Sequence, residues 1–149
     1  MLQKASYTRL HKVKTMGNRP YEKLKFYEDA CELRKKVYEM TEAFSKTHMR
    51  LVSQMRDAAR SAKQNIREGY RKGTLGEFIH SIKISQGSLE ELCGDLQDCC
   101  DDKLITQKEY ADCLKLAKSA LYMSTQYVKS MSRNENKKNW INPGCEKKI

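Results

Sequence analysis

The chain has 149 residues, a length that suits one domain with a hydrophobic core of its own. It is 39% apolar and 32% charged, and no apolar run approaches the roughly 20 residues of a membrane-spanning helix, so the composition excludes an integral membrane protein. The net charge of +10 favours partners with an acidic surface or a phosphate backbone.

Residues 1–20 are predicted to form a basic arm. Residues 1–25 carry seven basic side chains and one acidic side chain, and Lys12 and Lys14 are candidates for electrostatic anchoring of a polyanion. The opening residues lack the apolar stretch of a secretory signal, so we expect a cytoplasmic protein. Met16 lies shortly before the first predicted helix, and a start there would remove both lysines.

Four segments then show the apolar spacing of α-helices, at about 21–44, 47–71, 74–102 and 106–131. The residues predicted to face the core are Phe26, Ala30, Leu33, Val37, Met40 and Phe44, then Leu51, Met55, Ala58, Ala62, Ile66 and Gly69, then Phe78, Ile82, Ser85, Leu89, Leu92 and Leu96, and finally Tyr110, Cys113, Ala117, Ala120, Tyr127 and Met131. Short connections between long helices favour antiparallel neighbours. We therefore predict an all-α fold, an antiparallel up-down-up-down four-helix bundle over residues 21–132.

The ends of these segments carry helix-capping signals. Gly73 closes the second segment, and Thr74 with Glu77 and Thr106 with Glu109 have the spacing of capping boxes. Gly87 lies within the third segment, where glycine costs about 1 kcal/mol relative to alanine. We expect Gly87 to permit the close approach of another helix.

After the fourth segment, residues 133–149 are predicted to form a polar, basic tail. It carries five basic and two acidic side chains, and the adjacent Lys137 and Lys138 are further candidates for electrostatic anchoring. We expect both the arm and the tail to become ordered on binding a partner.

Signatures of enzymes and metal sites are largely missing. The glycine-containing stretch at 73–78 lacks the Lys-Ser/Thr of a phosphate-binding P-loop. Glu77 and His80 have an ExxH spacing, but di-iron bundles need that motif on two helices, and Glu77 is already assigned to a cap. We predict no catalytic residue, no metal and no cofactor.

The six cysteines do not form paired CxxC motifs. They are Cys31, Cys93, Cys99, Cys100, Cys113 and Cys145. The first three and Cys113 fall on or next to apolar helical positions, where a free thiol acts as a small hydrophobic side chain. We predict reduced, structural cysteines.

The strongest candidate site is a basic stripe on the second helical segment, formed by Arg56, Arg60, Lys63, Arg67 and Arg71. The spacing places the five side chains within about an 80° arc on one flank of the helix. Arginine donates bidentate hydrogen bonds to phosphate oxygens, so such a stripe suits a phosphate backbone. Aromatic residues are dispersed rather than interleaved with the stripe, which favours recognition of backbone or shape over base stacking.

Two alternatives for the basic stripe remain open. Residues 73–102 carry seven acidic side chains and one basic side chain, so the stripe is also suited to pair with the third helix, within one subunit or between subunits. The stripe is otherwise an ordinary solvated surface.

Several short motifs resemble those of the 23S rRNA intervening-sequence family. They are LKFYEDA at 24–30, LVSQMRDAARS at 51–61, NIREG at 65–69 and GSLEEL at 87–92, and the resemblance covers roughly 21–131. It implies a four-helix bundle that assembles into a homo-oligomeric, pentameric ring and associates with nucleic acid. A related branch is the accessory variability determinant of diversity-generating retroelements, which binds a reverse transcriptase and its template RNA.

Together, the stripe and the resemblance lead to the hypothesis of a non-catalytic RNA-binding scaffold, an accessory subunit of a reverse-transcriptase ribonucleoprotein. The expected partners are copies of the chain itself, RNA and a reverse transcriptase. The candidate RNA-binding residues are Arg56, Arg60, Lys63, Arg67, Arg71, Lys72, Lys12, Lys14, Lys137 and Lys138. The alternative hypothesis is a protein–protein interaction module of the same family that does not bind nucleic acid directly. The motif residues Asn65, Glu68 and Gly69 are expected to be structural, with the Asn65 amide bridging two helices.

Overall fold

The computed structural model describes residues 20–133. Most of the predicted arm and tail, with Lys12, Lys14, Met16, Lys137, Lys138 and Cys145, therefore lies outside the described residues. A 3-10 turn, η1 (Pro20–Lys23), leads into α2 (Lys25–Thr41), and a second one, η2 (Lys46–His48), leads into α3 (Met49–Arg71). They are followed by α4 (Leu75–Asp101) and α5 (Gln107–Ser132), and residues 20–133 contain no strand.

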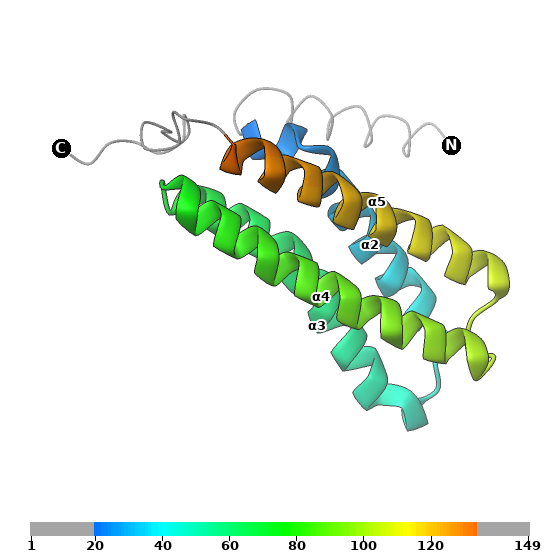
Figure 1. The fold of residues 1–149 in the computed structure, drawn as a ribbon. Coiled ribbons are helices and arrows are strands. Elements are labelled where there is room, and N and C mark those ends of the chain that lie inside the picture. The colour runs from blue at the N-terminus through cyan, green and yellow to red at the C-terminus, as the bar shows by residue number, and fades with distance from the viewer. Residues whose placement is uncertain (1–19, 134–149) are drawn as a thin grey trace, which may run out of the picture.

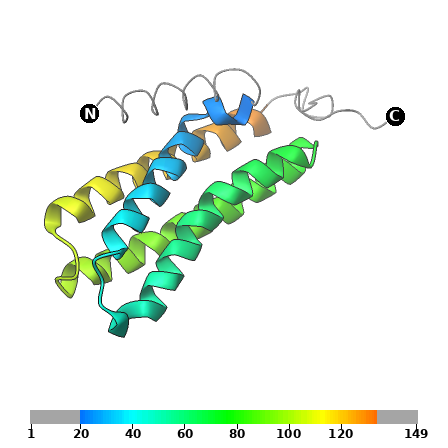
Figure 2. The ribbon, with the colours of Figure 1, turned by 180° about the vertical axis from the view of Figure 1, so that it is seen from behind.

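The four α-helices form the predicted antiparallel bundle. Figure 1 shows α2 beside α5 and α3 beside α4, with each helix running opposite to the one before it. The helices pack in the order α2, α3, α4, α5 around the core, and the contact between α3 and α4 is the most extensive. Seen from behind in Figure 2, the tight α3–α4 turn lies at one end of the bundle, and the α2–α3 and α4–α5 connections lie at the other.

The predicted core is largely confirmed. All six core positions of α4 are buried, and Leu33, Val37, Met55 and Ile66 are among the largest side chains that are almost completely inaccessible. The exceptions are half-buried and lie mostly near helix ends: Phe44, Leu51, Tyr110, Tyr127 and Met131. No helix within residues 20–133 is both long enough and apolar enough to cross a membrane.

The predicted caps are present, one of them only in part. Thr106 accepts a hydrogen bond from the Glu109 backbone N–H at 3.1 Å, and the Glu109 carboxylate accepts one from the Thr106 N–H at 3.0 Å, which completes a capping box. Thr74 accepts from the Glu77 N–H at 3.3 Å, but its own hydroxyl, not its backbone N–H, donates to the Glu77 carboxylate. Gly73 adopts a φ of 89° and reverses the chain between α3 and α4, as only glycine does without strain.

The prediction for Gly87 is wrong, because its role in close packing belongs to Gly69. Gly87 is exposed, and a methyl group added there would meet no atom within 4 Å. A methyl group at Gly69 would instead lie 2.5 Å from the Ser81 Oγ and closer still to its Cβ. Gly69 therefore allows α3 and α4 to approach each other near their shared turn.

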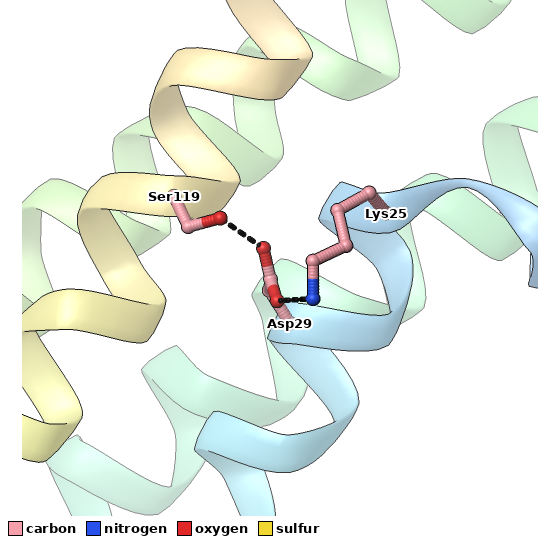
Figure 3. Close-up of polar contacts among 3 residues, drawn as sticks. All are labelled: Lys25, Asp29 and Ser119. Carbon is pink, nitrogen blue, oxygen red and sulfur yellow. Dashed lines mark hydrogen bonds and ion pairs between the residues drawn. The ribbon is translucent and has the colours of Figure 1, made fainter.

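A buried carboxylate joins α2 to α5. Asp29 is only 1% exposed; its Oδ1 lies 2.9 Å from Lys25 Nζ, and its Oδ2 accepts a hydrogen bond from Ser119 Oγ at 2.6 Å (Figure 3). The hydrogen bond between Lys25 and Asp29, together with the negative charge of Asp29, raises the pKa of Lys25 above its ordinary value. The buried charge is thus both paired and hydrogen-bonded, the condition under which such a group is tolerated.

Candidate functional site

The basic stripe lies on the flank of α3 that adjoins α2. Arg60, Lys63 and Arg67 line a groove of about 230 Å³ together with Arg34 and Tyr38 of α2. Gln64 completes the lining, so that the groove has four cations and no carboxylate. The central residues of the stripe therefore belong to a surface that α2 and α3 form together.

Arg34 was not among the residues predicted from the sequence. It stands four residues before Tyr38 on α2, so that both side chains face α3, and the Arg34 guanidinium lies 5.2 Å from the centre of the Tyr38 ring. The signal in the sequence was the run of three cations at 34–36, which begins between two core positions of the first predicted helix.

Arg56, the first residue of the stripe, is engaged by the protein itself. Its Nε donates to Thr41 Oγ1 at 3.0 Å, and its Nη2 donates to the Tyr38 carbonyl oxygen at 3.4 Å. The guanidinium also stacks over the Tyr38 ring at 4.5 Å. Arg56 thus adds a hydrogen bond to a carbonyl at the end of α2 that already accepts one from the Glu42 N–H, and it is less available to a ligand than Arg60.

The opposite end of the stripe is exposed. Arg71 and Lys72 are exposed at the end of α3, where Lys72 forms the C-cap. They lie beyond the groove, which ends with Arg67. The structure therefore divides the predicted stripe into an engaged start, a grooved centre and an exposed end.

Within residues 20–133, the positive charge of the groove has no carboxylate to neutralise it. Burial lowers the pKa of Lys63, and the charges of Arg34, Arg67 and Lys35 lower it further, against the opposing effect of the Cys31 thiol. Among residues 20–133, no carboxylate lies within ion-pair distance of the groove cations. The Nε atoms of Arg34 and Arg67 are buried, and neither has a hydrogen-bond acceptor in the described part of the chain.

The acidic side chains of α4 do not pair with the basic stripe within the subunit. Asp95 accepts hydrogen bonds from Gln54 at 3.3 and 3.4 Å, and Asp101 accepts one from Gln97 at 3.4 Å. Burial raises the pKa of Asp95, and the neighbouring charge of Glu91 adds to this effect. Within residues 20–133, the stripe therefore does not pair with the carboxylates of α4 in the same subunit, and pairing between subunits is left as the alternative.

The other candidates from the sequence lie apart from the groove. Glu77 and His80 are exposed on the first turns of α4, and the described residues contain no cluster of three or more acidic, histidine or cysteine side chains that could hold a metal. The five described cysteines are free thiols. Burial raises the pKa of Cys99 and of Cys113 to about 11, which keeps both thiols protonated at neutral pH.

The Asn65 amide does not bridge two helices directly, contrary to the expectation. Its Nδ2 donates to the Ser61 carbonyl oxygen at 2.8 Å and to the Ser61 Oγ at 3.0 Å, both within α3. The Ser61 hydroxyl in turn lies 3.0 Å from the Ser88 hydroxyl of α4. Asn65 thus supports a contact between helices that the two serines make.

Comparison with known proteins identifies one family. The family model described as 23S rRNA-intervening sequence protein matches residues 22–126, which run from η1 to the last part of α5. No curated protein matches the chain.

Proposed function

The chain belongs to the 23S rRNA-intervening sequence protein family, and from that premise we propose that it is a non-catalytic, RNA-binding scaffold. The observation that carries the proposal is the α2–α3 groove, which gathers Arg34, Arg60, Lys63 and Arg67 without a carboxylate. Guanidinium groups recognise phosphate oxygens through paired N–H donors, and clustered cations release counterions when they bind a polyanion.

The scaffold is proposed to be a homo-oligomer, with a pentameric ring as the arrangement that the resemblance implies. Large apolar side chains on α4 and α5 support an assembly, since Ile84 is 43% exposed, Tyr122 64% and Met123 39%. Exposed apolar side chains of this size are frequent at protein–protein interfaces. In the most concrete version of the proposal, the ring is an accessory subunit that holds template RNA and docks a reverse transcriptase, like the accessory variability determinant.

A filter-binding titration with single-stranded RNA across salt concentrations tests RNA binding. Three phosphate contacts along the basic stripe would give a slope of log affinity against log salt of about −2, since each contact contributes roughly −0.7. We expect the double variant Arg60→Glu, Arg67→Glu to lose most of the affinity and most of the slope. The matched control, Lys83→Glu with Lys118→Glu, makes the same change of charge on exposed positions of α4 and α5 and should retain both. A flat salt dependence, or equal affinities of the two variants, would contradict the proposal.

A second candidate function is a protein–protein interaction module without direct binding of nucleic acid. It is favoured by the acidic face of α4, where Glu90, Glu91 and Asp98 are exposed and complement the cations of α3. Light scattering after size exclusion separates the two functions. The Arg60→Glu, Arg67→Glu variant should keep the wild-type mass if the stripe faces RNA, and it should give a smaller species if the stripe seals contacts between subunits.

A further inference from the structure

The α2–α3 groove brings together cations from two helices, whereas the stripe alone belongs to α3. Arg34 lines the groove from α2, and Lys63 and Arg67 line it from two successive turns of α3. The mutual effect of these side chains is repulsive, because the charges of Arg34 and Arg67 both lower the pKa of Lys63. Holding them together has a free-energy cost that a bound anion would offset.

Two arginines that line the groove each have a donor that lacks a partner within the described residues. The Nε–H groups of Arg34 and Arg67 are buried, and a buried donor without an acceptor costs about 1–3 kcal/mol, more when the group is charged. Arg56 on the same helix has both its Nε and an Nη nitrogen satisfied by α2. Arg67 therefore differs from Arg56, although both arginines lie on the flank of α3 that adjoins α2.

We propose that this groove binds a single phosphate group, with the guanidinium groups of Arg34 and Arg67 and the ammonium group of Lys63 as its ligands. The groove volume of about 230 Å³ is several times the ~30 Å³ that one water molecule occupies in the liquid. The guanidinium groups of Arg34 and Arg67 carry planar pairs of N–H donors, which match two oxygens of a phosphate group. Lys63 adds a point charge.

The inference narrows the proposed function, because it assigns a local site where the stripe alone suggests a continuous track along α3. It rests on the proposed function for one statement only, that the phosphate group belongs to RNA. Phosphate binding in the groove is a separate property. Inorganic phosphate and RNA are therefore two arms of the same experiment.

The direct test follows the Nε–H resonances of the arginines by ¹⁵N NMR while inorganic phosphate is added to the full chain. We expect saturable shifts for Arg34 and Arg67, and no comparable shift for Arg50, an exposed arginine in the first turn of α3 that serves as the internal control. Chloride at matched ionic strength should leave all three unchanged. Equal responses of the three arginines to phosphate, or equal effects of phosphate and chloride, would overturn the site.

Variants then test the donors. Arg67→Lys keeps the charge but removes the planar pair of donors, and we expect the affinity for phosphate to fall roughly tenfold or more. Arg50→Lys is the matched control and should leave the affinity unchanged. Circular dichroism checks that both variants fold, and the titration of the wild-type chain is independent of any variant. An unchanged affinity of a folded Arg67→Lys variant would refute the assignment of Arg67.

The RNA arm separates failure of the site from failure of the proposed function. If inorganic phosphate shifts Arg34 and Arg67 but RNA does not bind, the site holds and the proposed function fails. If RNA binds and leaves both resonances unchanged, RNA binding holds and the site fails. If RNA shifts the same resonances and inorganic phosphate competes with it, both hold.

Discussion

Replacement of Gly69 by alanine is expected to destabilise the bundle, because no space exists for the added methyl group. The new Cβ would lie 2.5 Å from Ser81 Oγ and closer still to Ser81 Cβ, whereas ordinary contacts begin at 3.4 Å. Rotation of the Ser81 side chain moves its Oγ but not its Cβ, so relief requires α3 and α4 to separate. Ser81 is 2% exposed, and these two helices make the most extensive contact in the fold.

The magnitude follows from two opposing contributions. Overpacking of a well-packed site costs about 1–3 kcal/mol, and the upper end applies here because the backbone has to shift. Alanine in place of a helical glycine returns about 1 kcal/mol. We therefore expect Gly69→Ala to lower the free energy of unfolding by about 2 kcal/mol, which corresponds to a decrease in melting temperature of roughly 8 °C for a domain of this size.

Urea denaturation followed by circular dichroism measures this change against two controls. Gly87→Ala introduces the same methyl group on α4 at a position with no atom within 4 Å, and it should stabilise the protein by up to about 1 kcal/mol. The double variant Gly69→Ala, Ser81→Gly removes the obstructing side chain, and it should recover most of the loss. The reasoning is refuted if Gly69→Ala is as stable as Gly87→Ala, or if the effects of Gly69→Ala and Ser81→Gly simply add.

Two further predictions concern the basic stripe and a buried thiol. Arg56→Gln should lower the free energy of unfolding by about 1–2 kcal/mol, because it removes charge-assisted hydrogen bonds to the end of α2. Arg60→Gln, at an exposed position, should change the free energy of unfolding by less than about 0.5 kcal/mol. Thermal unfolding of both variants checks this prediction, and equal losses of stability would contradict it. Burial raises the pKa of Cys113 to about 11 from an ordinary value of 9.0, so the folded state favours the neutral thiol. The neutral thiol therefore contributes to stability below pH 9, and this contribution is lost as the pH rises to about 11. Denaturation at pH 8.5 and pH 11 should therefore show a smaller pH-dependent loss for Cys113→Ala than for the wild-type chain, and identical losses would argue against a protonated thiol.

Positions that face the core were predictable because they depend on the period of a single helix. The third helical segment shows this best, since the spacing of Phe78, Ile82 and Leu89 alone places all three in the core. Capping residues are equally local, and Thr106 with Glu109 forms the expected box. Both kinds of prediction need no knowledge of the neighbouring helix.

Predictions failed where the outcome depends on which residues of two helices face each other. Gly69 and Gly87 are both helical glycines, and only the alignment of α3 with α4 shows that Ser81 faces the first while open space surrounds the second. Arg34 was missed for the same reason, because the period of α2 does not indicate that Arg34 lies beside Arg67 of α3. Pairing between helices depends on the packing of whole side chains, which the spacing within one helix does not specify.

The two flanks of α3 have complementary roles in forming the groove. Toward α4, small residues bring the backbones together: Gly69 faces Ser81, and the Ser85 hydroxyl donates to the Ala62 carbonyl oxygen at 2.5 Å. Toward α2, the long side chains of Lys63 and Arg67 line the groove between the helices. Because Arg67 is two residues from Gly69 on the same helix, a displacement of α3 from α4 that leaves α2 in place also moves Arg67 relative to α2. The close α3–α4 contact therefore contributes to the position of the groove cations as well as to the stability of the bundle.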